Sequence, residues 1–321
     1  MLSRRHLLAG ASAALIAGCQ NPAPEQRQQE PPPPPPTTRL LFGGDVMLSR
    51  HVGRLARMHK DPAFSFRDLA HTLAEADIAF INLESPFSDR GRPVEKGMIF
   101  KAEPEMIEGL QLAGIDVVST SNNHSRDRAG YGILFTLDWL QKHGISAVGT
   151  GRTAEEAHAG TVVERNGIRF GFLAYTYDQR NGNYPDDDDR VAVLDAVRAA
   201  EDIASIKRRS DVVIVSMHAG EEYHRKPSSR QVSFARSAID GGATLVIGHH
   251  PHVVQTVEQY KGGVIFYSLG NLVFDQFHRK DTQEGLLAEA IFIGKDLAAH
   301  SVKQVEIRRT VPRLKQVEGC T

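Results

Sequence analysis

The most constraining feature of the sequence is an apolar run, Ala243–Ile247, that ends abruptly in Gly248-His249-His250-Pro251-His252. A buried strand that stops at a glycine and then presents imidazoles is typical of α/β proteins, which place ligands at the carboxyl ends of their strands. Because alternate residues of an extended segment point the same way, His250 and His252 are expected to reach one metal ion or two neighbouring ions. Pro251 favours extended geometry at His250. The alternative is a histidine-rich surface turn.

The same pattern, an apolar run followed at once by polar side chains, recurs along the chain. Four further runs end in Asp45, in Asn82-Leu83-Glu84, in Asn122-Asn123-His124 and in His218. Helical periodicity between them predicts helices over 66–76, 104–113, 130–143, 194–208 and 229–240, and closing strands are expected over 263–268, 287–292 and 302–308. Two β-rich runs flank Asn166-Gly167, which favours a type I′ hairpin. These elements predict a layered α/β domain with sheets packed face to face.

Composition limits the classes of protein to consider. The chain has 321 residues, 41% hydrophobic and 24% charged, which is enough apolar material for one large domain or two small ones. Its net charge of -1 argues against a nucleic-acid partner, which would require a basic surface. Cys19 and Cys320 are the two cysteines, so no disulfide framework is expected.

The amino terminus has the pattern of an export signal. Paired arginines, Arg4-Arg5, precede the apolar run Leu7–Gly18, which is too short to span a bilayer and resembles a twin-arginine signal peptide over residues 1–18. The run ends in Leu15-Ile16-Ala17-Gly18-Cys19, which resembles a lipobox and predicts lipidation of Cys19; a chance cysteine after a signal peptide is the alternative. Residues 19–38 contain six consecutive prolines and are expected to be a linker.

This organisation predicts an exported lipoprotein of the cell envelope, held by its lipid on the periplasmic face of a membrane. The folded domain is expected over residues 39–310, followed by a tail over 311–321.

The strand ends together supply six candidate metal ligands. Carboxylate, amide and imidazole donors form a mixed N/O set that suits Zn²⁺, Mn²⁺ or Fe better than Ca²⁺. Six ligands exceed what one tetrahedral ion uses, so two divalent ions are expected, with Glu84 as the candidate bridge. The candidates are Asp45, Glu84, Asn123, His218, His250 and His252.

Each of these residues also has a structural interpretation. Asp45 is suited to capping a helix that follows it, His218 to a hydrogen-bonded place in the core, and Asn123 to a turn. All of these alternatives must hold separately for the metal site to be absent.

A series of short motifs in the region Leu40–Leu287 resembles the CapA family of poly-γ-glutamate capsule synthesis proteins. That family resembles the calcineurin-like metallophosphoesterases, and the likeness implies their fold. It implies that Asp45 and His252 bind one ion, that Asn123, His218 and His250 bind the other, and that His124 is the acid. The motifs are Gly44-Asp45-Val46-Met47, Asn82-Leu83-Glu84, Asn122-Asn123-His124 with Asp127, His218, Gly248-x-His250-Pro251-His252 and Ser268-Leu269-Gly270-Asn271.

The sequence departs from the phosphoesterase pattern at two points. Met47 stands where the first histidine of that pattern would be, and Asn82-x-Glu84 replaces its Gly-Asp block. A single or differently filled metal site therefore remains an alternative to two filled sites.

Further residues have expected roles around the metals. His124 has an imidazole suited to protonating a leaving oxygen, and Asp127 is expected to orient it. Lys101 is a candidate for attracting an anionic substrate, with an ordinary surface lysine as the alternative. Asn82 and Asn271 are candidate substrate-binding residues.

These residues and the resemblance predict a metal-dependent hydrolase, of the phosphoesterase type, acting on a phosphoester or another anionic polymer linkage in capsule or envelope metabolism. One alternative is an amide hydrolase or transferase acting on a γ-glutamyl polymer. Another is a non-catalytic component of polymer synthesis or export that keeps the metal site for binding or structure, because fold does not determine function.

Overall fold

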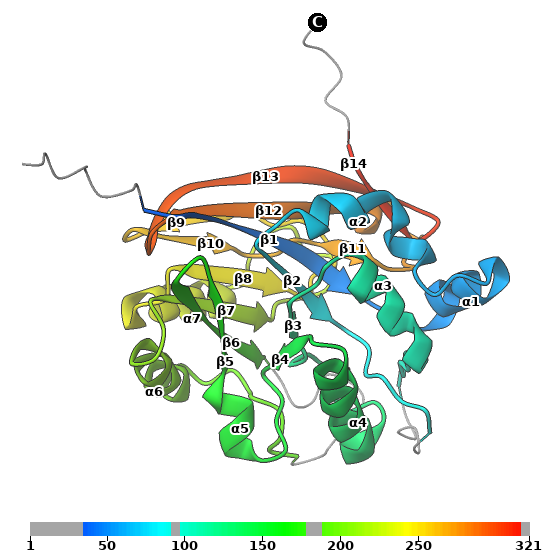
Figure 1. The fold of residues 1–321 in the computed structure, drawn as a ribbon, viewed down its shortest axis with the longest axis horizontal. Coiled ribbons are helices and arrows are strands. Elements are labelled where there is room, and N and C mark those ends of the chain that lie inside the picture. The colour runs from blue at the N-terminus through cyan, green and yellow to red at the C-terminus, as the bar shows by residue number, and fades with distance from the viewer. Residues whose placement is uncertain (1–34, 91–96, 178–187, 316–321) are drawn as a thin grey trace, which may run out of the picture. The chain divides into compact units, whose positions relative to one another are not determined.

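The computed structural model describes residues 35–90, 97–177 and 188–315. All of them belong to the compact unit that begins at Pro35 (Figure 1). The expected signal peptide, Cys19 and residues 19–34 of the linker lie outside the described residues, as do residues 316–321 of the tail. Within the described ranges, no helix combines the length and apolar character needed to cross a bilayer.

The described strands form two sheets (Figure 1). The first has the order β14 (Val311–Leu314), β13 (Asp296–Arg308), β12 (Glu284–Ile293), β1 (Thr37–Val46), β2 (Ile78–Leu83), β3 (Val117–Ser119) and β4 (Ser146–Val148), with β11 (Asn271–Val273) beside β1. The second has the order β5 (Thr161–Arg165), β6 (Ile168–Thr176), β7 (Val212–His218), β8 (Leu245–His249), β10 (Gly263–Phe266) and β9 (Val257–Tyr260). Neighbouring strands from β1 to β4, and from β6 through β8 to β10, are parallel.

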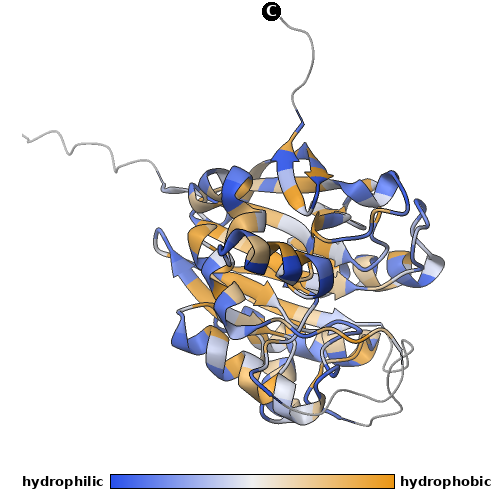
Figure 2. Cartoon of the chain, turned by 90° about the vertical axis from the view of Figure 1, so that its right-hand side faces the viewer, coloured by the Kyte–Doolittle hydropathy of each residue, from blue (hydrophilic) through white to orange (hydrophobic). Residues whose placement is uncertain are grey.

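The two sheets pack face to face over a shared hydrophobic core. Phe42 and Phe80 from the first sheet and Phe172 from the second belong to one buried cluster, in which the rings of Phe80 and Phe172 stack at 5.8 Å. Burial of each such ring contributes on the order of 2 kcal/mol to folding. Figure 2 shows the hydrophobic residues concentrated on the strands. The predicted layered α/β architecture is therefore confirmed.

Helices cover the outer faces of both sheets. The first sheet packs against a hydrophobic cluster with residues from α1 (Arg50–His59), α2 (Arg67–Ala74), α3 (Ile107–Leu112) and α4 (Ala129–Lys142). The second packs against a cluster with residues from α5 (Ala154–Ala159), α6 (Ala196–Lys207) and α7 (Ser229–Gly241). Short 3₁₀ turns are η1 (Phe64–Phe66), η2 (Pro104–Met106) and η3 (Asp281–Gln283).

Local sequence fixes the ends of several elements. The hydroxyl of Ser228 accepts a hydrogen bond from the backbone N–H of Gln231, whose side chain accepts one in return, so α7 begins with a capping box. Gly242 ends the helix at a φ of 107° and starts the chain towards β8. In the predicted hairpin, Asn166 and Gly167 have φ values of 54° and 76°, as a type I′ turn requires.

Strand β1 continues through Gly43 and Gly44 to Val46. The reason is the close approach of β11: a Cβ at Gly44 would overlap the carbonyl oxygen of Gly270. This contact pairs Asp45 with Asn271 on one side, while β2 pairs it with Asn82 on the other. The side chains at the carboxyl ends of these strands are thereby placed next to one another.

Candidate metal centre

The candidate ligands gather where parallel strands of the two sheets end. Asp45 is the penultimate residue of β1 and Glu84 directly follows β2, while Asn123 lies in the loop after β3. His218 is the last residue of β7, and the loop after β8 supplies His250 and His252. Asn123 is partly exposed and the other five are buried. The Asn82 amide joins the two sheets here, because its Nδ2 donates to Asp45 Oδ1 at 2.8 Å and lies 3.3 Å from His218 Nδ1.

Asp45, Glu84 and His252 form the tightest group. One ligand atom from each lies within 4.8 Å of the others. His252 Nδ1 is 3.4 Å from Asp45 Oδ2, and its Nε2 is 3.7 Å from Glu84 Oε1. Among the described histidine, cysteine, aspartate and glutamate residues, no other set of three or more meets this condition.

Both carboxylate oxygens of Glu84 are buried without a hydrogen-bond partner. A buried carboxylate left in this state costs several kcal/mol, so it is retained where a cation or a proton compensates it. Two hard oxygen donors and one imidazole are a common ligand set for Zn²⁺, Mn²⁺ or Fe. The buried group therefore fits a divalent metal ion.

Asn123, His218 and His250 lie together beside this group. His218 Nε2 is 2.8 Å from Asn123 Oδ1, and the rings of His218 and His250 are 4.8 Å apart. His250 Nδ1 is buried and has no hydrogen-bond partner. These three residues could complete a second ion site, although His218 and His250 do not belong to the tight group.

The expected extended geometry at His250 is wrong. His250 and His252 have φ values of 97° and 58°, in the left-handed region that residues other than glycine rarely adopt. The backbone N–H of His250 donates to Asp45 Oδ2 at 3.1 Å, and the carbonyl of Pro251 accepts from Tyr223 N at 2.8 Å. These bonds hold a tight turn that costs about 1–3 kcal/mol per strained residue and places the two imidazole rings 6.1 Å apart.

Charges within the tight group act in both directions: His252 stabilises the charged forms of both carboxylates, whereas the two carboxylates repel each other. Burial by itself would raise the pKa of Asp45, but hydrogen bonds and charge from His249 and His252 hold it well below its usual value. Burial opposes the charged form of His252, yet the Glu84 charge and the Asp45 hydrogen bond raise its pKa to about 9. Burial is also the main reason that the pKa of Glu84 lies well above its usual value.

The other two histidines are held in their neutral form. Burial, followed by the charge of His252, lowers the pKa of His250 to about 3. Burial and the neighbouring His250 lower the pKa of His218 well below its usual value. Neutral imidazoles have a free lone pair, so both side chains are in the state that metal binding requires.

His124 lies at the edge of the tight group. Its Nδ1 is 2.6 Å from Asp127 Oδ2, and its Nε2 is 3.9 Å from Glu84 Oε1. The ring stacks on Phe100 at 3.9 Å, and Asp127 also accepts the backbone N–H of Phe100 at 2.6 Å. Asp127 therefore orients the imidazole so that Nε2 faces the candidate metal ligands.

The candidate substrate-binding residues have different surroundings. Asn82 and Asn271 are fully buried, and Asn271 Oδ1 lies 3.0 Å from His252 Nδ1, so both hold ligands in place. Lys101 Nζ is 2.9 Å from the carboxylate of Glu103, as expected of a surface lysine. Ser49, rather than Asp45, occupies the N-cap position of α1, which removes the capping interpretation of Asp45.

Sequence reasoning gave no role to four residues at this site. His249 is fully buried with Nδ1 3.4 Å from Asp45 Oδ1, and Asn122 donates to the carbonyl of Leu83 at 2.8 Å. The Arg50 guanidinium lies over the rings of Phe100 and Phe274. The ring centres of Tyr223 and His252 are 6.4 Å apart. The histidine run and the Asn122-Asn123 pair were signals for the first two, whereas nothing local distinguishes Arg50 or Tyr223.

Comparison with known families identifies the fold and its relatives. The family model of the bacterial capsule synthesis protein PGA_cap matches residues 39–276, a region that contains the whole candidate metal centre. The chain belongs to this family. The resemblance inferred from the motif series is therefore confirmed.

Two relatives of this chain carry the name CapA. The capsule biosynthesis protein CapA of Bacillus anthracis is 32% identical over 246 residues, covering 73% of this chain and 59% of the relative. The PGA biosynthesis protein CapA of Bacillus subtilis (strain 168) is 29% identical over 276 residues, covering 84% of this chain and 72% of the relative. The chain thus spans 59% of the length of the first of these relatives.

Solved structures show the same fold. A novel phosphatase from Mycoplasma pneumoniae has a TM-score of 0.57 at 14% identity, over 85% of this chain and 94% of that protein. A hypothetical protein from Thermus thermophilus has a TM-score of 0.52 at 18% identity, over 84% of this chain and 99% of that protein. This member of the capsule synthesis family therefore has a metallophosphatase-like fold, as predicted.

Proposed function

We propose that this protein is a metal-dependent hydrolase of the metallophosphatase type that cleaves a phosphoester in capsule or envelope polymer metabolism. The observation that carries the proposal is the buried, unpartnered carboxylate of Glu84, which faces His252 and His124. A buried carboxylate without a hydrogen-bond partner, placed between two imidazoles, supports metal binding at this position.

The donors divide into two neighbouring sets. Asp45, Glu84 and His252 would hold one divalent ion, and Asn123, His218 and His250 would hold a second. Mn²⁺, Zn²⁺ and Fe are the ions that suit these donors. When bound, such ions supply Lewis acidity for a phosphoryl oxygen and lower the pKa of water.

The side chains of the protein supply proton transfer and orientation. His124 would give a proton from Nε2 to the leaving oxygen, because Asp127 already engages Nδ1. Asn271 fixes the His252 ring through Nδ1, which leaves Nε2 directed at Glu84. The Asn82 amide donates to Asp45 Oδ1 and the backbone N–H of His250 donates to Oδ2, so both carboxylate oxygens of Asp45 are held. This arrangement keeps the ligands in position before substrate arrives.

The names of the relatives support an anionic polymer as the source of the substrate. One is a capsule biosynthesis protein and another is a PGA biosynthesis protein. The proposed location follows from the amino-terminal sequence: a lipid on Cys19 and a proline-rich linker would hold the domain at the periplasmic face of the cell envelope.

One observation favours a second candidate, a non-catalytic or amide-processing role in polymer synthesis or export. Met47 is fully buried where phosphoesterases have their first histidine, and its sulfur accepts the backbone N–H of Ser49 at 3.1 Å. The first ion would thus have one imidazole fewer, and a site with weaker catalysis can still bind polymer.

Paired metal and activity measurements separate these candidates. The purified domain is analysed for bound metal and assayed on p-nitrophenyl phosphate and bis(p-nitrophenyl) phosphate with Mn²⁺ or Zn²⁺. We expect turnover that falls about 100-fold or more in His124→Ala while metal content is retained. His71→Ala is the matched control, because that side chain is 90% exposed on α2. Metal binding without turnover on either ester would favour the second candidate.

A further inference from the structure

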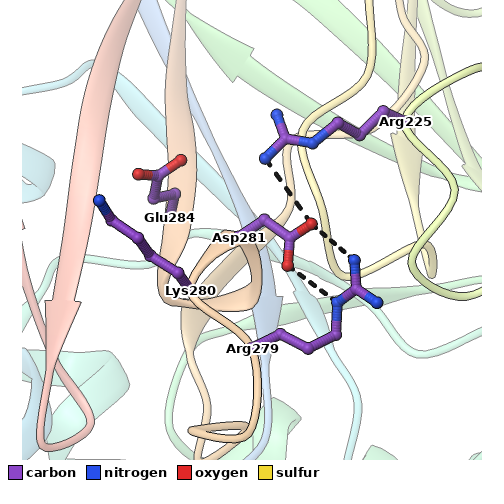
Figure 3. Close-up of a pocket in the computed structure, with 5 residues that line it drawn as sticks. All are labelled: Arg225, Arg279, Lys280, Asp281 and Glu284. Carbon is purple, nitrogen blue, oxygen red and sulfur yellow. Dashed lines mark hydrogen bonds and ion pairs between the residues drawn. The ribbon is translucent and has the colours of Figure 1, made fainter.

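A charged groove lies beside the candidate metal centre. Its first part has a volume of about 530 Å³ and is lined by Arg225, Arg279, Lys280, Asp281 and Glu284 (Figure 3). A second part of about 300 Å³ shares Arg225, Lys280 and Glu284 and extends along β12 and β13 to Lys315. The shared lining makes the two parts one elongated groove, which suits a chain better than a small molecule.

Cations outnumber carboxylates in the lining of this groove by one: Arg225, Arg279, Lys280 and Lys315 face Asp281, Glu284 and Glu306. Arg279 forms a two-pronged pair with Asp281 at 2.9 and 2.8 Å, and Arg225 approaches the same carboxylate at 3.6 Å (Figure 3). The Glu306 carboxylate is paired with Arg308 at 2.9 Å. Within the described part of the chain, Lys280 and Lys315 form no ion pair, but the carboxylates of Glu284 and Glu306 line the same groove, and Glu306 interacts electrostatically with both lysines.

The groove is joined to the metal centre by two sets of contacts. The Arg279 guanidinium lies 5.2 Å from the centre of the Tyr223 ring, which also approaches His252 at 6.4 Å. The carbonyl of Thr282, next to Asp281, accepts from Asn271 Nδ2 at 2.8 Å, and Asn271 holds His252. These contacts place the groove next to the metal centre, on the side of Tyr223 and Asn271.

We propose that this groove binds the carboxylate or phosphate groups of a polyanionic chain while one linkage of that chain lies at the metal centre. The inference rests on the proposed function, because it assumes that the metal centre takes a polymer. It adds a binding site whose cations are Arg225, Lys280 and Lys315, in which Asp281 pairs with Arg279 of its own loop and is approached by Arg225 of another loop. Several exposed cations along one elongated groove favour successive charges of a chain over a single anion.

Binding measurements on the Mn²⁺-loaded full chain test the groove directly. Fluorescently labelled γ-linked glutamate oligomers, a dimer and a decamer, are compared by fluorescence anisotropy, and glycerol phosphate oligomers of the same lengths form a second arm. We expect the decamer of at least one chemistry to bind more tightly than its dimer. Arg225→Ala with Lys280→Ala should weaken decamer binding about tenfold, since each exposed charge pair contributes up to about 1 kcal/mol. Dimer binding should be unchanged.

The control is the pair Arg208→Ala with Lys261→Ala, which removes two exposed cations from the side of the second sheet. Lys280→Arg should restore binding that Lys280→Ala reduces. Equal decamer binding by the double variant and the control, or no preference for decamer over dimer with either chemistry, would overturn the proposal. Hydrolysis of p-nitrophenyl phosphate, measured in parallel, reports the proposed function separately, because neither Arg225 nor Lys280 contacts the metal ligands.

Discussion

Glu84 is the residue on which the account of the metal centre depends most. It combines complete burial, two unpartnered oxygens and a pKa raised well above its usual value, first by burial and then by the charges of Asp45, Glu222 and Asp127. Without a metal ion this side chain destabilises the folded protein, and with one it becomes a ligand. Replacing Glu84 by a neutral side chain should therefore stabilise the metal-free protein and destabilise the metal-bound protein.

Glu84→Gln should stabilise the metal-free protein by about 1–3 kcal/mol and weaken metal affinity about 100-fold. The amide keeps the shape of the side chain and removes the buried charge. Thermal unfolding with and without EDTA, together with a Mn²⁺ titration, measures both effects. Glu105→Gln, on the surface turn η2, is the matched control. A destabilised metal-free variant with unchanged metal affinity would show that Glu84 is not a ligand.

Asp127→Asn should lower kcat by about 10- to 100-fold with metal content unchanged. The carboxylate holds His124 Nδ1 at 2.6 Å and the backbone N–H of Phe100, and an amide would satisfy one of these groups less well. Steady-state kinetics and metal analysis of the same preparation measure the effect. Asp138→Asn, 61% exposed on α4, should have wild-type kinetics. Loss of metal together with activity would place Asp127 in a structural role instead.

At the scale of elements, the sequence predicts strand ends better than it predicts the turns between them. Apolar runs that stop at ligand-type residues identified β2, β3, β7 and β8, because buried parallel strands require such runs. The left-handed conformation of His250 was not predictable, because a hydrogen bond to Asp45, 205 residues away, holds it. The helix α1 was missed although it has a buried face that contains Val52 and Ala56, one turn apart.

Contacts between residues that are distant in the sequence could not be predicted either. Arg50 and Tyr223 contact the rings around the metal ligands only because loops distant in sequence meet there. The burial of Asn271 was not predictable for the same reason, because it depends on the pairing of β11 with β1. Local pattern gives the identity of metal ligands, whereas tertiary contacts decide which neighbours hold them.

Gly44→Ala should be strongly destabilising, by about 3 kcal/mol or more, and should reduce metal affinity. The added Cβ would overlap the backbone of Gly270 and push β11 away from β1, which moves Asn271 and Asp45 apart. Chemical denaturation and a Mn²⁺ titration measure the two losses. Gly53→Ala in α1 is the control, because its Cβ would meet neighbours at 3.5 and 3.6 Å and should be neutral or stabilising. Equal stability of the two variants would contradict the close approach of β11.

At the scale of the whole described domain, the metal centre links the two sheets. Asp45 and Glu84 come from the first sheet, and His218, His250 and His252 come from the second. An ion bound by both sheets stabilises the folded state and does not bind the unfolded chain in the same way. Metal removal should therefore affect the domain as a unit.

Removing metal with EDTA should lower the Tm by about 5 °C or more, because ligand at about 100 times its Kd contributes roughly 2.7 kcal/mol. Calorimetry should show one transition that moves as a whole, and adding Mn²⁺ or Zn²⁺ should restore it. His252→Ala should have a Tm that no longer responds to metal, while His71→Ala should respond like the wild type. If the Tm of the wild type did not change with metal, the bound ion would not contribute to the stability of the folded domain.

The most direct test of the central claim is anomalous diffraction from a crystal of this domain soaked in Mn²⁺. The account predicts an anomalous peak bounded by Asp45, Glu84 and His252, with any second peak on the side of Asn123, His218 and His250. Well-ordered side chains at these positions with no anomalous peak among them, at a saturating Mn²⁺ concentration, would contradict it.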